Sequence, residues 1–265
     1  MELYSWNING YRTCDRFGGF SKILQKSPDF ICCQEVKISR PETMTNLFTQ
    51  EYHFFHNLSK DKGRNGVVVY SKQKPSRYEF SIGCERFDSE GRFMCLEFDN
   101  FILMNIYMPH GGRDKKDISY KLLVYHFLGE YLEEKLKKSK SILLVGDFNV
   151  AYNDMDLARF KDNKNNIMYT DNERKAFLRI LSLGFADVYR VSYPQNREYT
   201  WWPYAYCARE RNIGWRIDYM LMSGQNNIIE DIEICSDIYG SDHCPMRIAF
   251  NVTEKSGIGQ FYCEV

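Results

Sequence analysis

The chain has 265 residues, of which 44% are hydrophobic and 26% are charged, and its 35 Lys and Arg residues balance 35 Asp and Glu residues. This composition excludes intrinsic disorder, coiled coil and collagen, and the apolar runs fall far short of the roughly 20 residues that a membrane span needs. The zero net charge argues against a protein that coats nucleic acid by bulk positive charge, although it permits a local basic face.

Short runs rich in Val, Ile, Phe, Tyr and Leu recur along the chain and predict strands, and apolar residues at helical spacing predict three helices. The strands are expected, in chain order, at 3–8, 29–36, 66–71, 94–98, 101–107, 141–148, 215–222, 228–235 and 245–252, and the helices at 17–26, 118–138 and 172–183. Many strands with few, separated helices favour an α/β fold of two packed sheets with helices outside over a doubly wound parallel sheet.

Nine cysteines are scattered along the chain, with no Cys-x-x-Cys pair and no histidine spacing typical of a zinc site. The pattern predicts reduced structural thiols in an intracellular protein, and the N-terminus lacks the basic start and long apolar stretch of a secretion signal. No repeat, linker or low-complexity tract divides the chain, so we expect one domain over residues 1–265, monomeric and without membrane association.

The first two predicted strands end in polar residues. Asn7 and Asn9 close the first strand, and Glu35 closes the second. Mg²⁺ takes oxygen ligands in proteins, often only one or two carboxylates together with water and phosphate. Glu35 with Asp147 or Asp242 would provide such a set, so these strand ends are candidates for a metal site.

The strand expected at 141–148 runs into Gly146 and then presents Asp147 and Asn149. Their i, i+2 spacing places both side chains on one face if the extended geometry persists. Two interpretations are equally open for this pair alone. The carboxylate and the carboxamide hold a water and a phosphate oxygen together, or they bind the backbone in an ordinary turn.

Asp218 lies inside an otherwise apolar predicted strand, where an unpaired buried carboxylate would be costly. His243, which follows Asp242 in the turn-like run 240–245, is an attractive partner, because a carboxylate fixes the tautomer of histidine and favours the imidazolium. A lone histidine in such a loop is more often structural than catalytic, and that alternative stays open. Together these fragments form the inventory of a metal-dependent phosphodiesterase: a cation ligand, a water activator, a phosphate clamp and an orienting acid.

These residues, in this order, resemble the exonuclease III-type apurinic/apyrimidinic (AP) endonucleases of the endonuclease/exonuclease/phosphatase superfamily. The motifs that carry the resemblance run nearly from end to end, at 6–10, 34–37, 105–109, 146–149, 187–190, 212–223 and 241–243. The run Asn-Ile-Gly-Trp-Arg-Ile-Asp-Tyr-Met-Leu-Met-Ser at 212–223 is the most discriminating, and with Gln-Glu-x-Lys it points to the abasic-site branch. The resemblance implies a four-layer α/β sandwich, in which two mostly antiparallel sheets are flanked by helices.

The resemblance also implies a Mg²⁺ site, with Mn²⁺ able to substitute. Glu35 would bind the cation, and Asn7, Asp147 and Asp242 would support the site. Asn9 stands where some relatives carry Asp, which leaves the number of metal ions open.

In the implied reaction, Asp147 orients or deprotonates the attacking water and Asn149 helps to position it. His243, paired with Asp218, contacts the scissile phosphate, while Tyr107 binds a phosphate oxygen or assists the leaving group. Asn7 is placed with these catalytic residues. The mechanism expected is in-line hydrolysis, driven by positioning and by electrostatic stabilisation of a charged transition state.

Substrate binding is expected to rest on aromatic and basic side chains. Trp201, Trp215 and Ile217 would line a pocket for a flipped-out sugar that lacks its base, whereas Trp202 is as readily a core residue. The phosphate backbone would be held by four arginines in loops, with Asn105 among the substrate-binding residues; the arginines are Arg12, Arg64, Arg92 and Arg113. His110 stands where relatives commonly carry Asn or Gln, which would make a phosphate contact there pH-dependent.

The function that the resemblance implies is cleavage of double-stranded DNA on the 5′ side of abasic sites, leaving a 3′-hydroxyl and a 5′-deoxyribose phosphate. A 3′–5′ exonuclease and a 3′-phosphodiesterase activity are possible additions. The alternative within the superfamily is a phosphodiesterase or phosphatase acting on inositol phosphates or sphingomyelin, which would not need the tryptophan pocket. An alternative of another class is a catalytically silent DNA-binding protein.

Overall fold

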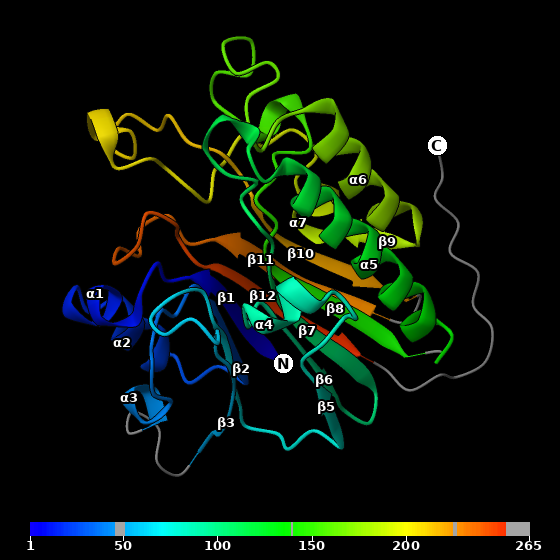
Figure 1. The fold of residues 1–265 in the computed structure, drawn as a ribbon. Coiled ribbons are helices and arrows are strands. Elements are labelled where there is room, and N and C mark those ends of the chain that lie inside the picture. Colours follow the sequence, from blue (N-terminus) through cyan, green and yellow to red (C-terminus); the bar gives the residue numbers. More distant parts are fainter. Residues whose placement is uncertain (46–50, 139, 225–226, 253–265) are drawn as a thin grey trace.

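Two six-stranded sheets pack face to face in the computed structural model, which describes residues 1–45, 51–138, 140–224 and 227–252 (Figure 1). The first sheet has the order β11-β12-β1-β2-β4-β3, formed by Asn227–Ile234, Met246–Val252, Glu2–Asn7, Phe30–Gln34, Val67–Ser71 and His53–Asn57. The second has the order β5-β6-β7-β8-β10-β9, formed by Arg77–Glu79, Phe93–Glu97, Phe101–Tyr107, Ser141–Asp147, Asp218–Ser223 and Phe185–Asp187.

Each sheet has one parallel pair at its centre, β1 with β2 and β7 with β8, and its other pairs are antiparallel. The carboxyl ends of a parallel pair meet at the same edge of a sheet, and an antiparallel neighbour begins at that edge. β12 begins beside the end of β1, and β10 begins beside the end of β8. β4 and β6 likewise begin beside the ends of β2 and β7. Residues that end four strands and begin four others therefore converge at one edge of the sandwich.

Alternation along the strands builds separate apolar layers. Cys32 of β2 points into the core between the sheets, whereas its neighbours Ile31 and Cys33 point into a second core beneath the helices on the outer face. That outer layer contains α1 (Tyr11–Arg16), α2 (Gly19–Leu24) and α3 (Glu42–Thr45).

A third core covers the outer face of the other sheet, beneath α4 (Glu85–Ser89), α5 (Ile118–Leu136) and α6 (Asp171–Ser182); the short α7 (Val188–Ser192) follows β9. Figure 1 shows α5 and α6 lying together over this sheet, on the side away from α1 and α2. The four-layer α/β sandwich with mostly antiparallel sheets is confirmed.

The predicted elements are found with small shifts of their ends, with one exception among the strands. β10 begins at Asp218, so the prediction of a strand from residue 215 was wrong at its start. Trp215 instead makes isolated β-bridges to Leu157 and Trp201, which lie in the segments between β8 and β9 and between β9 and β10 rather than in the sheet. The first helix is shorter than the predicted 17–26, and α1 was not predicted. The strands β3, β5 and β9 were missed, since they are short edge strands of five, three and three residues.

Eight cysteines lie in the described residues and all are free thiols, seven of them buried and Cys207 exposed. Cys263, the ninth, lies outside the described residues. Among the helices of the described chain, none combines the length and apolar character of a membrane span.

Candidate active site

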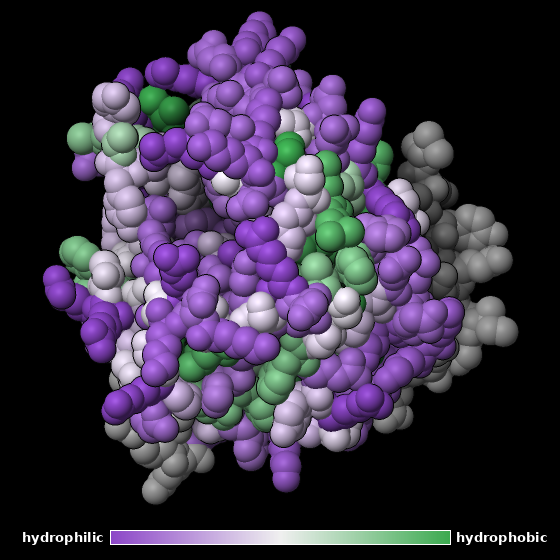
Figure 2. All heavy atoms as spheres, viewed as in Figure 1, coloured by the Kyte–Doolittle hydropathy of each residue, from purple (hydrophilic) through white to green (hydrophobic). Residues whose placement is uncertain are grey.

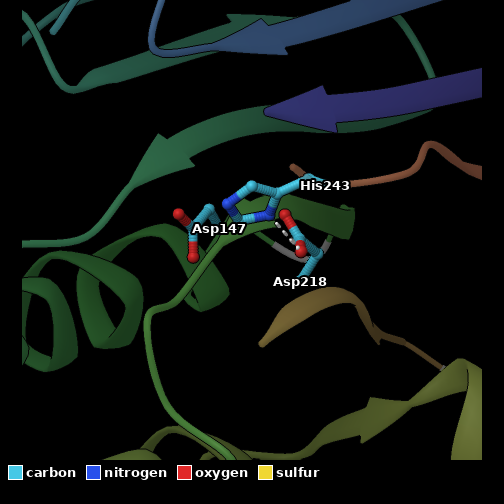
Figure 3. Close-up of side chains that lie close together, drawn as sticks. All are labelled: Asp147, Asp218 and His243. Carbon is cyan, nitrogen blue, oxygen red and sulfur yellow. Dashed lines mark hydrogen bonds and ion pairs between the residues drawn. The ribbon is translucent and has the colours of Figure 1, made fainter. Parts of the chain in front are cut away.

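The candidate active site lies at the sheet edge where the parallel strands end. Asp147 is the last residue of β8, Asp218 is the first residue of β10, and His243 lies three residues before β12. Asp147 and Asp218 are register partners, and ligand-type atoms of the three side chains all lie within 4.8 Å of one another. Figure 3 shows both carboxylates beside the imidazole ring.

His243 forms a buried ion pair with Asp218. Its Nδ1 atom lies 2.8 Å from Asp218 Oδ2, and the two residues are 5% and 3% exposed. Burial alone would lower the pKa of the imidazole, but the Asp218 carboxylate, together with the charges of Asp147 and Asp242, outweighs burial and raises the pKa of His243 to about 10. An imidazolium donates from both ring nitrogens, so this pair can present a charged donor to a phosphate oxygen.

Asp147 accepts three hydrogen bonds although it is almost completely buried. Its Oδ2 accepts from Asn7 Nδ2 at 2.9 Å and from Asn149 Nδ2 at 3.1 Å, and its Oδ1 accepts from the Asn149 backbone N–H at 2.8 Å. Burial and the nearby Asp218 carboxylate raise the pKa of Asp147 to about 7. A carboxylate with such a pKa can accept a proton from water near neutral pH, as a general base must.

The backbone over 146–149 explains why these residue types follow β8. Gly146 has a φ of +138°, and a Cβ atom there would lie 1.9 Å from the carbonyl oxygen of Ile106 on the neighbouring strand. Asn149 has a φ of +51°, in the left-handed region that Asn tolerates better than most residues. Asp147 and Asn149 do bind each other, as an ordinary turn expects, but Asp147 also lies beside His243, which a turn does not require.

Glu35 reaches this cluster through Tyr107. The Tyr107 hydroxyl donates a short hydrogen bond to Glu35 Oε1, and Tyr107 is the register partner of Asp147. On its other side Glu35 Oε2 lies 2.7 Å from Lys37 Nζ, which also contacts Asn9 Oδ1. One ammonium group therefore touches a carboxylate and an amide oxygen at a single point. Oxygen donors are the ligands that Mg²⁺ prefers, so these residues fit a hard divalent cation.

Asp242 lies on the opposite side of Asn9. Its Oδ1 accepts a hydrogen bond from Asn9 Nδ2 at 2.7 Å, and its Oδ2 accepts from the Trp201 indole Nε1 at 3.0 Å. Asp242 thus joins the oxygen-rich side of the site to the tryptophan side. Its part in holding a cation stays a prediction.

Trp201, Trp215 and Ile217 come together beside the catalytic cluster. Ile217 is buried in a small core with Leu157, and the two half-buried tryptophans pack against that core. The rings of Trp201 and Trp215 contact each other edge to face, with centroids 6.3 Å apart. The Trp201 backbone forms β-bridges to both Trp215 and His243. In contrast, Trp202 is 3% exposed and belongs to the core between the sheets, which agrees with the core interpretation of this residue rather than with a place in the predicted pocket.

Two predicted substrate contacts occupy other places. Asn105 is completely buried between the sheets, where its Nδ2 donates to the carbonyls of Cys33 and Val68 and its Oδ1 accepts from Gln34 at 2.7 Å. A side chain satisfied in this way cannot reach DNA without unfolding the sheet edge, so the prediction of a substrate contact was wrong. Its role is to join the two sheets behind the site.

Arg92 is only 9% exposed and does not extend from a free loop as predicted. Its guanidinium stacks on the Tyr107 ring at 4.3 Å, pairs with Glu90 and donates to Asn65. It is thus held behind Tyr107 by partners on three sides.

Three predicted arginines are exposed. Arg64 and Arg113 lie in or beside loops, whereas Arg12 lies on the helix α1. Arg12 lines a groove of about 350 Å³ together with Asn9, Gly10 and Lys37. Figure 2 shows a hollow on the face of the molecule that Figure 1 views, with largely hydrophilic residues around it. His110 is also exposed at the end of the loop after β7.

Arg216, which lies between Trp215 and Ile217, is fully buried and was not identified from the sequence. Arg216 donates from Nε to Asp156 at 2.9 Å and from both terminal nitrogens to Asp187 at 3.1 and 2.7 Å. These bonds hold the backbone on which Trp215 and Ile217 stand. The position of Arg216 between Trp215 and Ile217 indicated that it could be buried, but nothing near it in the sequence identified Asp156 and Asp187 as its partners.

Residues 4–243 match the endonuclease/exonuclease/phosphatase family. The chain is 41% identical over 95% of its length to an exodeoxyribonuclease of Bacillus subtilis, all of which is covered. It is 33% identical to a DNA-(apurinic or apyrimidinic site) endonuclease of Dictyostelium discoideum, over 95% of this chain and 71% of that protein. The solved structure of an AP endonuclease from Archaeoglobus fulgidus superposes with a TM-score of 0.83 at 29% identity, over 95% of this chain and 100% of that one.

Proposed function

The chain belongs to the endonuclease/exonuclease/phosphatase family, and we propose that it cleaves double-stranded DNA on the 5′ side of abasic sites in a reaction that requires Mg²⁺. Its relatives are exodeoxyribonucleases and AP endonucleases, and the chain is accordingly a hydrolytic nuclease of DNA repair. The observation that supports the finer proposal is that Trp201 forms β-bridges to both Trp215 and His243, so that the two half-buried indoles lie directly beside the acid–base cluster.

Hydrolysis requires a proton acceptor for water and a stabiliser for the phosphate. Asp147 suits the first role because its pKa is raised to about 7 and its three hydrogen bonds fix its orientation. His243 suits the second because Asp218 keeps its ring cationic. Burial and the Glu35 charge hold the pKa of Tyr107 well above its ordinary value, so its hydroxyl stays a neutral donor. Asn149 and Asn7 keep Asp147 in place.

Glu35 and the oxygens of Asn7, Asp147 and Asp242 are proposed to hold the cation. A bound Mg²⁺ ion, or Mn²⁺ in its place, would supply Lewis-acid stabilisation of the charge that develops on the phosphate. The support for this assignment is the contact of Lys37 Nζ with Glu35 Oε2 and with the amide oxygen of Asn9, whose amide nitrogen in turn donates to Asp242.

The tryptophan pocket is proposed to select the lesion. An abasic nucleotide costs less to extrude from the duplex than a paired base, and a compact apolar pocket excludes a sugar that still carries its base. Trp201 and Trp215 would contact the extruded sugar, with Ile217 as the buried floor. Arg12, Arg64 and Arg113 would then grip phosphates outside the pocket without reading sequence.

Residues 1–265 are proposed to act as one domain and as a monomer inside the cell. The buried free thiols support a reducing compartment, and DNA as the substrate supports an intracellular place. A 3′–5′ exonuclease and a 3′-phosphodiesterase activity are proposed as additions at the same site, because in all three reactions water attacks a phosphodiester and a 3′-hydroxyl is left on the DNA.

The test is incubation of the purified protein with a duplex that carries one tetrahydrofuran abasic analogue, in Mg²⁺ or in chelator. We expect a nick 5′ to the lesion, in Mg²⁺ alone, whose 3′ end a DNA polymerase can extend. The matched duplex without the lesion reports exonuclease activity from its ends, and Asp147→Asn protein, purified identically, controls for contaminating nucleases. Absence of a metal-dependent nick at an excess of protein would refute the proposal.

A further inference from the structure

A completely buried ion pair lies behind the loop that carries Asn149. Lys121 in the first turns of α5 and Glu173 in the first turn of α6 are both 0% exposed, and Lys121 Nζ forms a short ion pair with Glu173 Oε1. Burying two charges is expensive, and well-packed apolar residues of similar volume are often at least as stabilising. Such a pair therefore calls for a role besides stability.

The ammonium group also holds two loops of the active site by their backbones. Lys121 Nζ donates to the carbonyl oxygen of Asn149 at 2.5 Å and to that of His110 at 3.5 Å. Asn149 belongs to the loop that follows β8, and His110 to the loop that follows β7. The loops that follow Asp147 and Tyr107 thus share one hydrogen-bond donor, the Lys121 ammonium group.

Glu173 fixes the other end of the pair. Its Oε2 accepts from the Thr170 backbone N–H at 3.0 Å and from Thr170 Oγ1 at 2.7 Å, while its Oε1 accepts from the Met168 N–H at 3.0 Å. The Met168 carbonyl in turn accepts from Ala151 N–H at 2.8 Å. The Glu173 carboxylate is therefore fixed at the start of α6. It is linked to the loop that carries Asn149 through Met168, which binds both Glu173 and Ala151.

We propose that Lys121 is a positioning residue for hydrolysis, which holds Asn149 in its left-handed conformation so that Asn149 can orient Asp147. The proposal rests on the proposed function of this site. Asn149 contributes two of the three hydrogen bonds to Asp147, and its backbone φ of +51° is uncommon for a residue with a side chain. Without the Lys121 donor, the Asn149 carbonyl would be buried without this hydrogen bond. Because a buried, unpaired carbonyl is costly, other conformations of the loop would become more favourable.

The same helix provides a matched control. Lys135 is 7% exposed and pairs with Glu79 Oε2 at 2.6 Å, so it is also a largely buried lysine with a carboxylate partner. It lies 14 residues further along α5, which is about 21 Å along a helix. The Lys135–Glu79 pair joins α5 to the edge strand β5, away from the active site.

The experiment compares two double variants, each of which removes both charges of one pair so that no charge is left buried alone. In Lys121→Met/Glu173→Gln we expect kcat on the abasic duplex to fall by about 10- to 100-fold with KM within about threefold, since a small misplacement of a catalytic group costs about that much. In Lys135→Met/Glu79→Gln we expect kcat within about twofold of the wild-type value, at a comparable loss of Tm.

A second measurement does not depend on activity. Amide hydrogen exchange over residues 147–151 should become faster in the Lys121→Met/Glu173→Gln protein than in the Lys135→Met/Glu79→Gln protein, at equal distance from Tm. Equal kcat values for the two double variants, or unchanged exchange over 147–151, would overturn the positioning role. If the wild-type protein does not cleave the abasic duplex, the proposed substrate is wrong, while the exchange measurement still decides the role of Lys121.

Discussion

The rings of Trp201 and His243 lie 6.4 Å apart, centroid to centroid, and the backbones of the two residues form a β-bridge. On its other side Trp201 bridges to Trp215. The two tryptophans of the proposed pocket and the imidazole are therefore carried by neighbouring bridged segments that form one strip, so a ligand that is seated against the tryptophans is placed relative to the charged ring. Selection of the lesion and catalysis are expected to be coupled through this strip.

Replacement of Trp215 by alanine should weaken selection of the lesion more than it weakens hydrolysis. The half-buried indole would be lost from the pocket, and the space would admit a sugar with its base. We expect the ratio of kcat/KM for abasic and intact duplexes to fall by about tenfold, within the range that one apolar pocket contact supports. Trp202→Phe is the matched control, because Trp202 lies in the core. It should lower Tm and leave the ratio unchanged, and an unchanged ratio in Trp215→Ala as well would contradict the pocket assignment.

Replacement of Asp147 by asparagine should abolish proton acceptance while preserving the shape of the site. A positioned general base contributes about 100- to 10,000-fold to a rate, so we expect kcat to fall within that range. Duplex affinity, measured by fluorescence anisotropy in chelator, should stay within about fivefold of the wild-type value. A parallel loss of binding would assign Asp147 to substrate recognition instead.

The His243–Asp218 pair should make stability depend on pH above neutrality. Despite its burial, the ring has its pKa raised to about 10 by Asp218, whereas an unfolded histidine titrates near about 6.5. The folded state therefore binds more protons between these values, and the stabilisation is complete below about pH 6.5 and is lost as the pH rises toward 10. Thermal melts in chelator and reductant should show Tm falling from pH 6.5 to 9. In Asp218→Asn this slope should be much reduced; an equal slope would mean that other groups cause it.

The local motifs were sufficient to predict the acid–base cluster. Asp147 ends one strand, Asn149 follows it and Asp218 begins another, so short-range pattern and the family resemblance brought them to one sheet edge. Buried polar contacts between distant segments could not be predicted in this way. Arg216 and Asp156 are 60 residues apart, Lys121 and Glu173 are 52 apart, and no periodicity links such pairs.

Asn105 was assigned to substrate binding, and it is instead buried between the sheets. Alternation along β7 places it on one face of the strand, but only the packing of the second sheet reveals that this face is covered by Gln34. The sequence therefore could not distinguish a polar residue that faces DNA from one that faces the opposite sheet. Arg92 was misplaced for a similar reason, because the Tyr107 ring that covers it is distant in sequence.

The exposed and the buried arginine should differ in the salt dependence of DNA binding. Arg113 is exposed beside the loop after β7, whereas Arg92 is held by Glu90 and Tyr107. Each cation that neutralises a phosphate releases about 0.9 counterions, so loss of one such contact lowers the slope of log Kd against log salt by about 1. We expect that change in Arg113→Ala, measured with catalytically inactive Asp147→Asn protein on the abasic duplex.

Arg92→Ala should leave the salt slope unchanged and lower Tm instead, because it removes a stacked and ion-paired group from behind Tyr107. A reduced slope in Arg92→Ala would show that the arginine leaves Glu90 and turns toward DNA when the duplex binds. An unchanged slope in Arg113→Ala would remove it from the phosphate contacts. Since the chain has no net charge, binding must depend on a few local cations of this kind, and the slope of the wild-type protein counts them directly.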